Sequence, residues 1–353
     1  MIKEMINKVV RGEDLSEAEM VSMMTMIMEG RATDAQIGAF ITALRMKGET
    51  IDEITGAAKV MRDKATHIRT RDPIVGIDRD EIDVDLETVI DTCGTGGDGT
   101  STFNVSTTTA FVAAGGGLKV AKHGNRSVSS LCGSADVLEA LGVNLDVSPE
   151  VVESCIWDIG IGFLYAPKLH GAMKYAIGPR RETGIRSIFN VLGPLTNPAG
   201  ANVQVLGVYN RELTSLLAEV LGRLKSTRAM VVFGEGSFDE ISITGSTYVS
   251  ELKDGNVSEY SIVPEDFGMS RAQVDDIKGG NAKENAAIVQ NILKGEPGPK
   301  RDMILMNAAA AFYLSGKVKD MHEGIAMAGE SIDSGTAFTK LETLVEMTNR
   351  AGI

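Results

Sequence analysis

Apolar residues recur at helical spacing along the first 66 residues, as in the stripe formed by Ile37, Phe40, Ile41 and Leu44. Three helix starts carry the capping-box pattern, a Ser or Thr followed three residues later by Glu or Gln: Ser16 with Glu19, Thr33 with Gln36, and Thr50 with Glu53. Methionines cluster between residues 20 and 28. We interpret them as flexible core filler, and a methionine-lined ligand groove is the less favoured alternative. The pattern predicts a small helical domain over residues 1–70.

From residue 88 onward the pattern changes, and short apolar runs alternate with helix-like segments. Residues 118–122, 162–167, 203–210 and 229–235 are typical of buried strands, and residues 213–224 of an amphipathic helix. This alternation predicts a mainly parallel central sheet flanked by helices in a large domain, residues 88–353. Residues 241–263 predict a hairpin with a turn at Asp254-Gly255. The fold class is therefore α/β, with a charged linker over residues 71–87 between the two domains.

Composition narrows the class of protein. A formal net charge of −13 argues against wholesale binding of nucleic acid. The N-terminus has no signal-peptide core, and no apolar run approaches the roughly 20 residues of a membrane span. The three cysteines show no zinc-like spacing, which favours a reducing compartment. We expect a cytoplasmic protein with no nucleic-acid partner and no membrane contact.

Candidate chemistry concentrates in residues 88–107, TVIDTCGTGGDGTSTFNVST. Glycines bring backbone N–H groups close to a ligand, and a helix N-terminus just beyond adds partial positive charge. This arrangement predicts a phosphorylated ligand, and the carboxylate of Asp98 suggests a metal ion or a sugar hydroxyl beside it. The glycines also match the dinucleotide fingerprint, but the next strand ends in Lys122-His123 instead of the acid that would hold a ribose. The GK[ST] ending of a P-loop is absent as well.

A second polar glycine loop, KHGNRSVSSLCGS, covers residues 122–134 and follows another predicted strand. Loops at the carboxyl ends of parallel strands converge on one crevice, so both loops should face the same ligand. Lys122 and Arg126 add fixed positive charge to the serine hydroxyls. Together the loops predict a polyphosphate site.

Five motifs carry a resemblance to a known family. They are CGTGGD (93–98), NVST (104–107), KHGNRSVSS (122–130), GSADVLEALG (133–142) and GIRSIFNVLGPLTNP (184–198). In order and spacing they resemble the anthranilate phosphoribosyltransferases. The resemblance implies transfer of the phosphoribosyl group of phosphoribosyl pyrophosphate (PRPP) to anthranilate, with Mg²⁺, in tryptophan biosynthesis. It also implies a homodimer, a fold shared with pyrimidine nucleoside phosphorylases, and a helical segment near 168–190 that completes the small domain.

The resemblance also assigns site residues. For PRPP it implies both loops and the start of the helix after the first, namely Gly94, Gly97, Asp98, Thr102, Asn104, Val105, Ser106, Thr107, Lys122, His123, Gly124, Asn125, Arg126, Ser127, Val128, Ser129, Ser130 and Ser134. For anthranilate it implies Gly94, Asn125, His170 and Arg180, and for Mg²⁺ Ser106, Asp239 and Glu240. Asp98 is then expected to hold the ribose and not the metal.

Some of these assignments compete with other interpretations. Arg181 and Arg186 lie near Arg180 in sequence, and Gly171 follows His170 where the family commonly has proline. Without the resemblance, Asp239-Glu240 is most simply a solvated surface turn. The alternative functions are a pyrimidine nucleoside phosphorylase-type enzyme, or a non-catalytic paralogue that binds phosphates or nucleic acid. No acid or base is assigned, because a weakly basic aromatic amine depends more on positioning than on deprotonation.

Overall fold

The computed structural model describes residues 1–70, 88–97, 99–127 and 131–350. The linker predicted at 71–87 and four expected site residues, Asp98, Val128, Ser129 and Ser130, lie outside the described residues.

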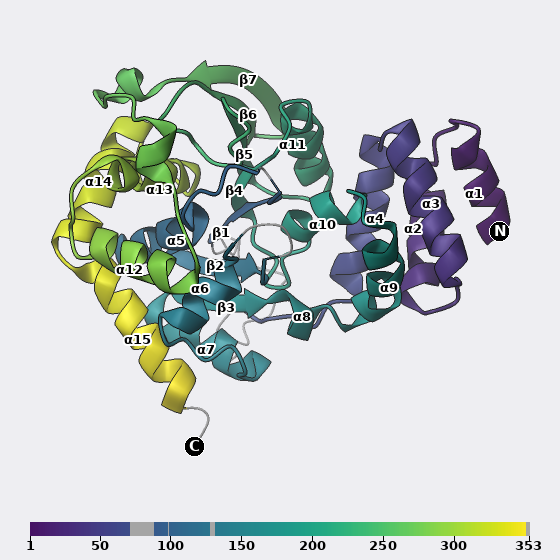
Figure 1. Ribbon diagram of the computed structural model, residues 1–353, viewed down its shortest axis with the longest axis horizontal. Helices are drawn as coiled ribbons and strands as arrows, with labels where there is room; N and C mark the ends of the chain where they lie inside the picture. Colours follow the sequence, from purple (N-terminus) through teal and green to yellow (C-terminus); the bar gives the residue numbers. More distant parts are fainter. Residues whose placement is uncertain (71–87, 98, 128–130, 351–353) are drawn as a thin grey trace, which may run out of the picture.

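The chain begins with four helices, as the apolar pattern predicts: α1 (Ile2–Val10), α2 (Glu17–Met28), α3 (Asp34–Lys47) and α4 (Ile51–Asp63). The three predicted capping boxes are confirmed, because the side chains of Ser16, Thr33 and Thr50 each accept the N–H three residues on. The predicted methionine core is confirmed as well, since the methionines of α2 are all buried. These helices form the N-terminal bundle at the right of Figure 1.

One buried ion pair ties the bundle together. The Glu53 carboxylate is fully buried and accepts from the Leu15 amide at 2.9 Å and from Lys47 Nζ at 3.0 Å. A buried charge is tolerated only when its lone pairs are satisfied, and here both partners are present. The pair therefore fixes the loops before α2 and α4 relative to each other.

The large domain is built on one seven-stranded sheet with the order β3-β2-β1-β4-β5-β6-β7. Its strands are β1 (Val89–Gly94), β2 (Lys119–Gly124), β3 (Ile161–Tyr165), β4 (Val203–Gly207), β5 (Arg228–Gly234), β6 (Thr247–Lys253) and β7 (Asn256–Ile262). The first five strands pair in parallel, and β6 and β7 form the predicted antiparallel hairpin at one edge. The turn at Asp254-Gly255 has positive φ at both residues, as that hairpin requires. The predicted mainly parallel sheet is thus confirmed.

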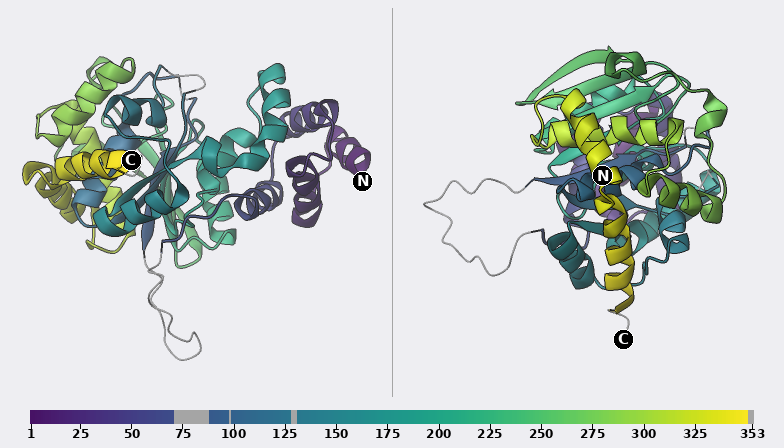
Figure 2. Two further views of the ribbon diagram at one scale, coloured as in Figure 1. Left: turned by 90° about the horizontal axis from the view of Figure 1, so that it is seen from below. Right: turned by 90° about the vertical axis from the view of Figure 1, so that its left-hand side faces the viewer.

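Helices cover both faces of this sheet (Figures 1 and 2). The helices that follow β1 in the chain are α5 (Val105–Gly115), α6 (Ser134–Ala140), α7 (Pro149–Ile159), α8 (Ala166–Leu169), α9 (Lys174–Thr183), α10 (Phe189–Leu195), α11 (Leu213–Arg223), α12 (Ala282–Leu293), α13 (Pro299–Leu314), α14 (Met321–Asp333) and α15 (Thr336–Arg350), with short 3₁₀ turns at Gly171–Met173, Pro264–Phe267 and Val274–Ile277. Successive strand residues face opposite sides, so in β5 Met230 and Val232 join one core cluster and Ala229 and Val231 join the other.

Helix α9 joins two distant parts of the chain. It lies far from the N-terminal bundle in sequence, yet it packs against α3 and α2. Among the described helices, none has both the length and the apolar character needed to cross a bilayer.

Candidate active site

The first glycine loop lies where the strand order reverses. On one side β1 pairs with β2, the next strand in the chain, and on the other side it pairs with β4, which comes much later in the chain. In open α/β sheets, ligands bind outside the carboxyl ends of the strands at such a switch point. The loop after β1 is held there, because the Thr95 amide donates to Gly207 O at 2.9 Å and Thr95 Oγ1 accepts from the Tyr209 amide at 3.2 Å.

Two properties explain the glycines of this loop. Gly96 and Gly97 have φ of 67° and 73°, which side chains rarely adopt. A Cβ on Gly94 would overlap the carboxylate of Asp239, which packs directly against this backbone. The glycine-rich sequence therefore lets an acid from a distant segment approach the loop.

Asp239 and Glu240 reach the site from a tight turn after β5. Gly234 and Phe238 exchange backbone hydrogen bonds at 2.8 and 3.1 Å, which closes the turn before the two acids. Asp239 Oδ2 accepts from the Gly96 amide at 2.8 Å, and Glu240 Oε1 accepts from the Ser106 amide at 3.1 Å. Asp239 is only 9% exposed. The simpler interpretation as a solvated surface turn is therefore wrong, and the pair lies in a loop where both acids can serve one site.

Ser106 lies in the first turn of α5, and Asn104 precedes that helix. Asn104 does not cap the helix with its side chain. Its side chain instead accepts from Asn285 Nδ2 at 2.9 Å and donates to Cys132 O at 3.3 Å. It therefore links the first loop to the end of the second loop. Val105 and Thr107 are buried, and Thr102 forms an isolated backbone bridge with Lys278.

The oxygen donors here suit a hard cation. Ser106, Asp239 and Glu240 offer one hydroxyl and two carboxylates, and the acids adjoin the same loop and helix start. Within the described residues, no group of three or more His, Cys, Asp or Glu side chains could hold a metal. Mg²⁺ typically takes one or two carboxylates together with substrate phosphates and water, so a sparse site of this kind fits it.

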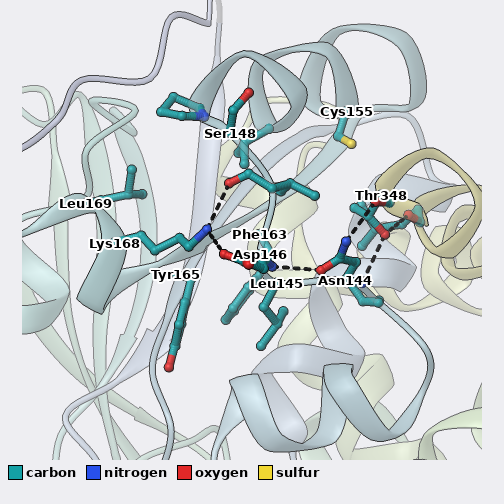
Figure 3. A pocket seen from close by; sticks show the side chains of 15 residues that line it. Asn144, Leu145, Asp146, Ser148, Cys155, Phe163, Tyr165, Lys168, Leu169 and Thr348 are labelled. Carbon is teal, nitrogen blue, oxygen red and sulfur yellow. Dashed lines mark hydrogen bonds and ion pairs between the residues drawn. The ribbon is translucent and has the colours of Figure 1, made fainter. Parts of the chain in front are cut away.

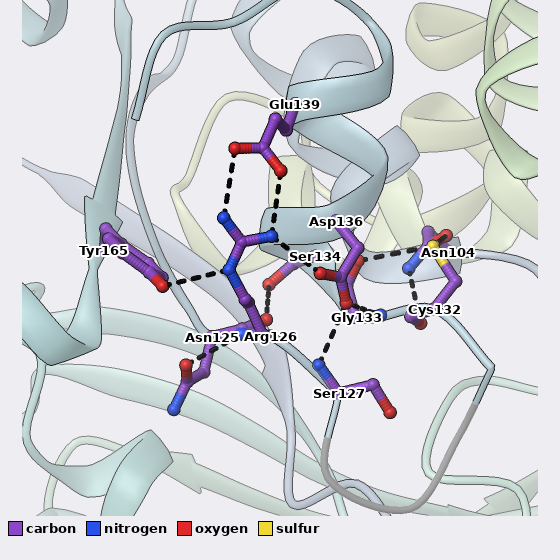
Figure 4. A network of polar contacts seen from close by, with 10 residues as sticks. All are labelled: Asn104, Asn125, Arg126, Ser127, Cys132, Gly133, Ser134, Asp136, Glu139 and Tyr165. Atoms are coloured by element: carbon purple, nitrogen blue, oxygen red, sulfur yellow. Dashed lines mark hydrogen bonds and ion pairs between the residues drawn. The ribbon is translucent and has the colours of Figure 1, made fainter. Parts of the chain in front are cut away.

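The second loop is shaped by a carboxylate outside the expected set of site residues (Figure 4). Asp136 Oδ2 accepts from the amides of Ser127 and Gly133, at 3.0 and 2.9 Å, so it holds both ends of the loop. Ser134 Oγ also donates to Asn125 O at 3.2 Å. The described ends of the loop are thus folded back on each other over the start of α6.

Arg126 is engaged by carboxylates and does not project freely from the loop. It donates to both oxygens of Glu139 at 2.8 and 3.0 Å, to Asp136 Oδ1 at 3.0 Å, and to the Tyr165 hydroxyl at 3.2 Å. The hydrogen bonds to Glu139 and Asp136 raise the pKa of Arg126. An anionic ligand that bound Arg126 would have to exchange with these partners (Figure 4).

Beneath the loops lies a buried polar layer. Lys122 is 4% exposed, and its Nζ donates to Thr92 O at 2.6 Å. His123 and His170 are also buried, and their Nε2 atoms lie 3.2 Å apart. Burial lowers the pKa of His123 to about 3 and that of His170 to about 4. Since both imidazoles are neutral near pH 7, one donates a hydrogen bond to the other.

The buried carboxylate of Asp91 supports this layer. It accepts from the His123 amide at 3.2 Å and from Asn197 Nδ2 at 2.8 Å. Burial raises the pKa of Asp91, and the charge of nearby Lys122 opposes that rise. The carboxyl ends of β1 and β2 are therefore joined below the glycine loops.

The arginines near the predicted acceptor position separate in space. Arg180 on α9 is half-buried over the ring of Phe189, 5.0 Å from its centroid, and burial lowers the pKa of its guanidinium. Arg186 donates to Gly97 O and lies 4.4 Å from the centroid of Tyr209. Arg186 thus contacts the first glycine loop directly.

Sequence reasoning missed Asp136, Glu139 and Tyr165, and it treated Arg186 only as a neighbour of Arg180. Asp136, Glu139 and Arg186 stand inside the motifs GSADVLEALG and GIRSIFNVLGPLTNP, so the signal lay in the quoted sequence. Their partners, however, lie up to 89 positions away in the chain. Only the folded chain brings them together.

Comparisons with known proteins agree with this architecture. The α/β domain model of a glycosyl transferase family matches residues 86–338, and the helical bundle domain model of the same family matches residues 3–65. Anthranilate phosphoribosyltransferase of Geotalea uraniireducens is 60% identical over 99% of this chain and 100% of its own. The enzyme of that name from Geobacter sulfurreducens is 59% identical over the same shares of the two chains.

Solved structures give the same result. The crystal structure of anthranilate phosphoribosyltransferase from Thermus thermophilus superposes with a TM-score of 0.89 at 41% identity, covering 98% of this chain and 99% of that one. A solved structure of anthranilate phosphoribosyltransferase from Saccharomyces cerevisiae, in complex with PRPP and Mg, superposes with a TM-score of 0.87 at 29% identity, covering 99% of this chain and 98% of that one. The fold, the order of the motifs and these full-length matches agree. The chain therefore belongs to the anthranilate phosphoribosyltransferase family.

Proposed function

We propose that this chain transfers the phosphoribosyl group of PRPP to the amine of anthranilate and releases pyrophosphate, as a step of tryptophan biosynthesis. The observation that carries the proposal is the meeting of three segments at the switch point of the sheet. The first glycine loop and the start of α5 each donate a backbone amide to the acidic pair after β5. A loop of amide donors beside two carboxylates suits a magnesium-bound sugar diphosphate.

In this proposal the two loops bind PRPP. Gly94, Gly97 and the N-terminus of α5 offer amides to the diphosphate, and Asn104 holds the first loop against the second. Arg126 would bind phosphate after exchanging with Glu139 and Asp136. Lys122 lies too deep to approach a ligand without a rearrangement, so its charge acts on the diphosphate from below. These contacts stabilise the negative charge that grows on the departing pyrophosphate.

Ser106, Asp239 and Glu240 would hold Mg²⁺. When bound, the ion supplies charge neutralisation for the pyrophosphate. A structure of the S. cerevisiae relative is in complex with PRPP and Mg, which supports Mg²⁺ as the cofactor. The hydrogen bonds from Gly96 and Ser106 orient the two carboxylates before any ion arrives.

Anthranilate would lie against Gly94, Asn125 and His170, with Arg180 binding its carboxylate through a bidentate pair. A structure of the S. cerevisiae enzyme in complex with 4-fluoroanthranilate supports an acceptor site in this fold. The low pKa values of His123 and His170 disfavour a general-base role, because such bases work best with a pKa near the operating pH. His170 is then an uncharged positioning contact.

The helical segment near 168–190 would complete the small domain and carry Arg180 with it. The packing of α9 against α3 and α2 supports this division. Closure of the small domain over the loops would deliver Arg180 to the acceptor and exclude water, which otherwise competes as nucleophile.

We also propose a homodimer formed through the small domain. Large apolar side chains are exposed on α1, α3 and α9, namely Val10, Met46, Tyr175 and Ile177. Helix α3 packs against both α1 and α9, so these side chains belong to one part of the molecule. Exposed apolar side chains gathered on one domain support an interface between subunits there.

The function is tested by incubating the purified protein with PRPP, Mg²⁺ and anthranilate and following anthranilate fluorescence. We expect depletion of anthranilate that requires both PRPP and Mg²⁺. A parallel incubation with a pyrimidine nucleoside and inorganic phosphate tests the phosphorylase alternative. A folded protein that releases free base in the second assay and leaves anthranilate intact in the first would overturn the proposal.

A further inference from the structure

A cavity of about 440 Å³ lies outside the catalytic loops, at the edge of the sheet beside β3 (Figure 3). Segment 143–148, the first turns of α7, strand β3, helix α8 and the end of α15 enclose it. Most of its lining is apolar, from Leu145, Val147, Val152, Phe163, Leu169 and Leu344. Its volume falls in the range of small-molecule pockets and far exceeds ordinary packing defects. None of these residues belongs to the sites proposed for PRPP, Mg²⁺ or anthranilate.

The mouth of the cavity carries one positive and one negative side chain. Lys168 forms an ion pair with Asp146, and its Nζ lies 3.5 Å from Val147 O (Figure 3). The Lys168 side chain is 40% exposed and that of Asp146 is 87% exposed. An ion pair this open to solvent contributes little to stability, so a ligand with its own charges can replace either half at small cost.

Asn144 and Thr348, two polar residues of the lining, are already bonded to each other. The Asn144 side chain donates to Thr348 O at 3.3 Å and accepts from the Asp146 amide at 2.9 Å. Segment 143–148 is therefore anchored to α15, and the ammonium of Lys168 and the carboxylate of Asp146 are the exchangeable charges.

A second hollow of about 430 Å³ continues from this cavity toward the PRPP loops. Both hollows are lined by Tyr165, Lys168 and Asp146, and the second also includes Arg126 and Glu139. The Tyr165 ring stacks on Phe163 inside the first cavity, and its hydroxyl accepts from Arg126 Nε at 3.2 Å. One side chain therefore touches both the apolar cavity and the arginine of the second glycine loop (Figure 4).

From this arrangement we propose that the cavity binds a free α-amino acid with a large apolar side chain. The side chain enters the apolar space, the α-carboxylate meets Lys168, and the α-ammonium meets Asp146. A simple carboxylic acid bound to Lys168 would place its negative charge beside the carboxylate of Asp146. A simple amine bound to Asp146 would place its positive charge beside the ammonium of Lys168. The mouth therefore selects a zwitterion over either half of it.

A ligand bound in the cavity should affect the conformation of the second glycine loop through Tyr165. A ligand that shifts the Tyr165 ring alters the hydrogen bond to Arg126 and so changes how readily Arg126 leaves Glu139 and Asp136. This coupling, unlike the binding itself, rests on the proposed role of Arg126 toward PRPP. It is expressed as a change in the KM for PRPP.

The binding is tested by isothermal titration calorimetry of the full chain with L-phenylalanine, in the absence of PRPP, Mg²⁺ and anthranilate. Benzoate and phenethylamine serve as single-charge probes. We expect saturable binding of L-phenylalanine, at least tenfold weaker binding of each single-charge probe, and at least tenfold weaker binding of L-phenylalanine to Lys168→Met. The control Lys253→Met removes an exposed lysine at the end of β6 and should bind like the parent.

No saturable heat with L-phenylalanine at millimolar concentration would overturn the site, whether or not the protein is an active transferase. Equal binding of benzoate, or equal loss in Lys253→Met, would overturn the assignment of the charges. For the coupling, L-phenylalanine should change the KM for PRPP at least threefold in the parent and leave it unchanged in Tyr165→Phe, which lacks the hydroxyl. An unchanged KM in the parent at saturating L-phenylalanine would overturn the coupling.

Discussion

Replacing Asp136 by alanine should weaken the use of PRPP far more than the use of anthranilate. The Asp136 side chain touches neither the acidic pair nor Arg180. It acts through the second loop, whose Ser127 and Gly133 amides it binds at 3.0 and 2.9 Å. Without these bonds the loop samples other conformations, and PRPP must select the competent one from among them.

The size of the effect can be worked out from these bonds. Hydrogen bonds to a charged acceptor contribute about 1.5–3 kcal/mol each. Because the Asp136 side chain is 23% exposed, the lower end of that range applies, which gives about 3 kcal/mol for the two amides together. Loss of the solvent-exposed ion pair with Arg126 acts in the opposite direction, because it frees Arg126 for phosphate, and its contribution is small beside that of the two amides. At about 1.4 kcal/mol per decade, the KM for PRPP should rise roughly 100-fold.

The assay is the steady-state depletion of anthranilate fluorescence with each substrate varied in turn. Asp266→Ala is the matched control, because Asp266 accepts the Val263 amide at 2.9 Å in a 3₁₀ turn of a different segment. We expect the KM for anthranilate to change less than about threefold in Asp136→Ala, and all constants to stay near the parent in Asp266→Ala. A KM for PRPP within threefold of the parent, in a variant with unchanged melting temperature, would refute the reasoning.

The acceptor arginine, the acidic pair and the buried histidines each give a further prediction. Arg180→Ala should raise the KM for anthranilate roughly 100-fold and leave the KM for PRPP nearly unchanged. The control Arg181→Ala, at an exposed neighbouring arginine, should change neither KM. An equal loss toward both substrates in Arg180→Ala would mean that the acceptor site is misplaced. Asp239→Asn should raise the Mg²⁺ concentration needed for half-maximal activity at least tenfold, and an unchanged requirement would exclude Asp239 as a ligand. Burial lowers the pKa of His170 in the folded chain from 6.5 to about 4. Between these two pH values the unfolded chain binds more protons at His170 than the folded chain does, so acidification lowers the free energy of unfolding. Between pH 7 and pH 5 the loss attributable to His170 is about 2 kcal/mol in urea unfolding, and His170→Gln should lack it; an identical pH dependence in the variant would contradict the assignment.

Much of the fold could be predicted because its signals are local. A capping box such as Ser16 with Glu19 binds amides within one turn of its own helix, so sequence neighbours contain the whole interaction. The parallel strands are short and largely buried, and the Asp254-Gly255 turn has the backbone chemistry of a hairpin. The glycine loops were likewise recognisable, because glycine spacing reflects conformations of the loop itself.

The candidate site could be predicted only as a set of residue types. The packing of Asp239 on Gly94 and of Glu240 on the start of α5 depends on the strand order, in which β4 lies beside β1 and β5 lies beside β4. No local pattern encodes this order. The interpretation of Asp239-Glu240 as a surface turn failed for this reason, since a solvated acid and an acid buried by a remote loop look alike in sequence.

The sequence by itself thus determined the helices, the strands, the glycine loops and the family resemblance, all of which rest on neighbouring residues or on ordered motifs. Only the tertiary structure decided that Arg126 is held by Glu139, Asp136 and Tyr165, and that His123 and His170 form a neutral buried pair. These outcomes depend on burial and on contacts between distant segments. Such contacts set the electrostatic environment of each group, and that environment exists only once the sheet has assembled.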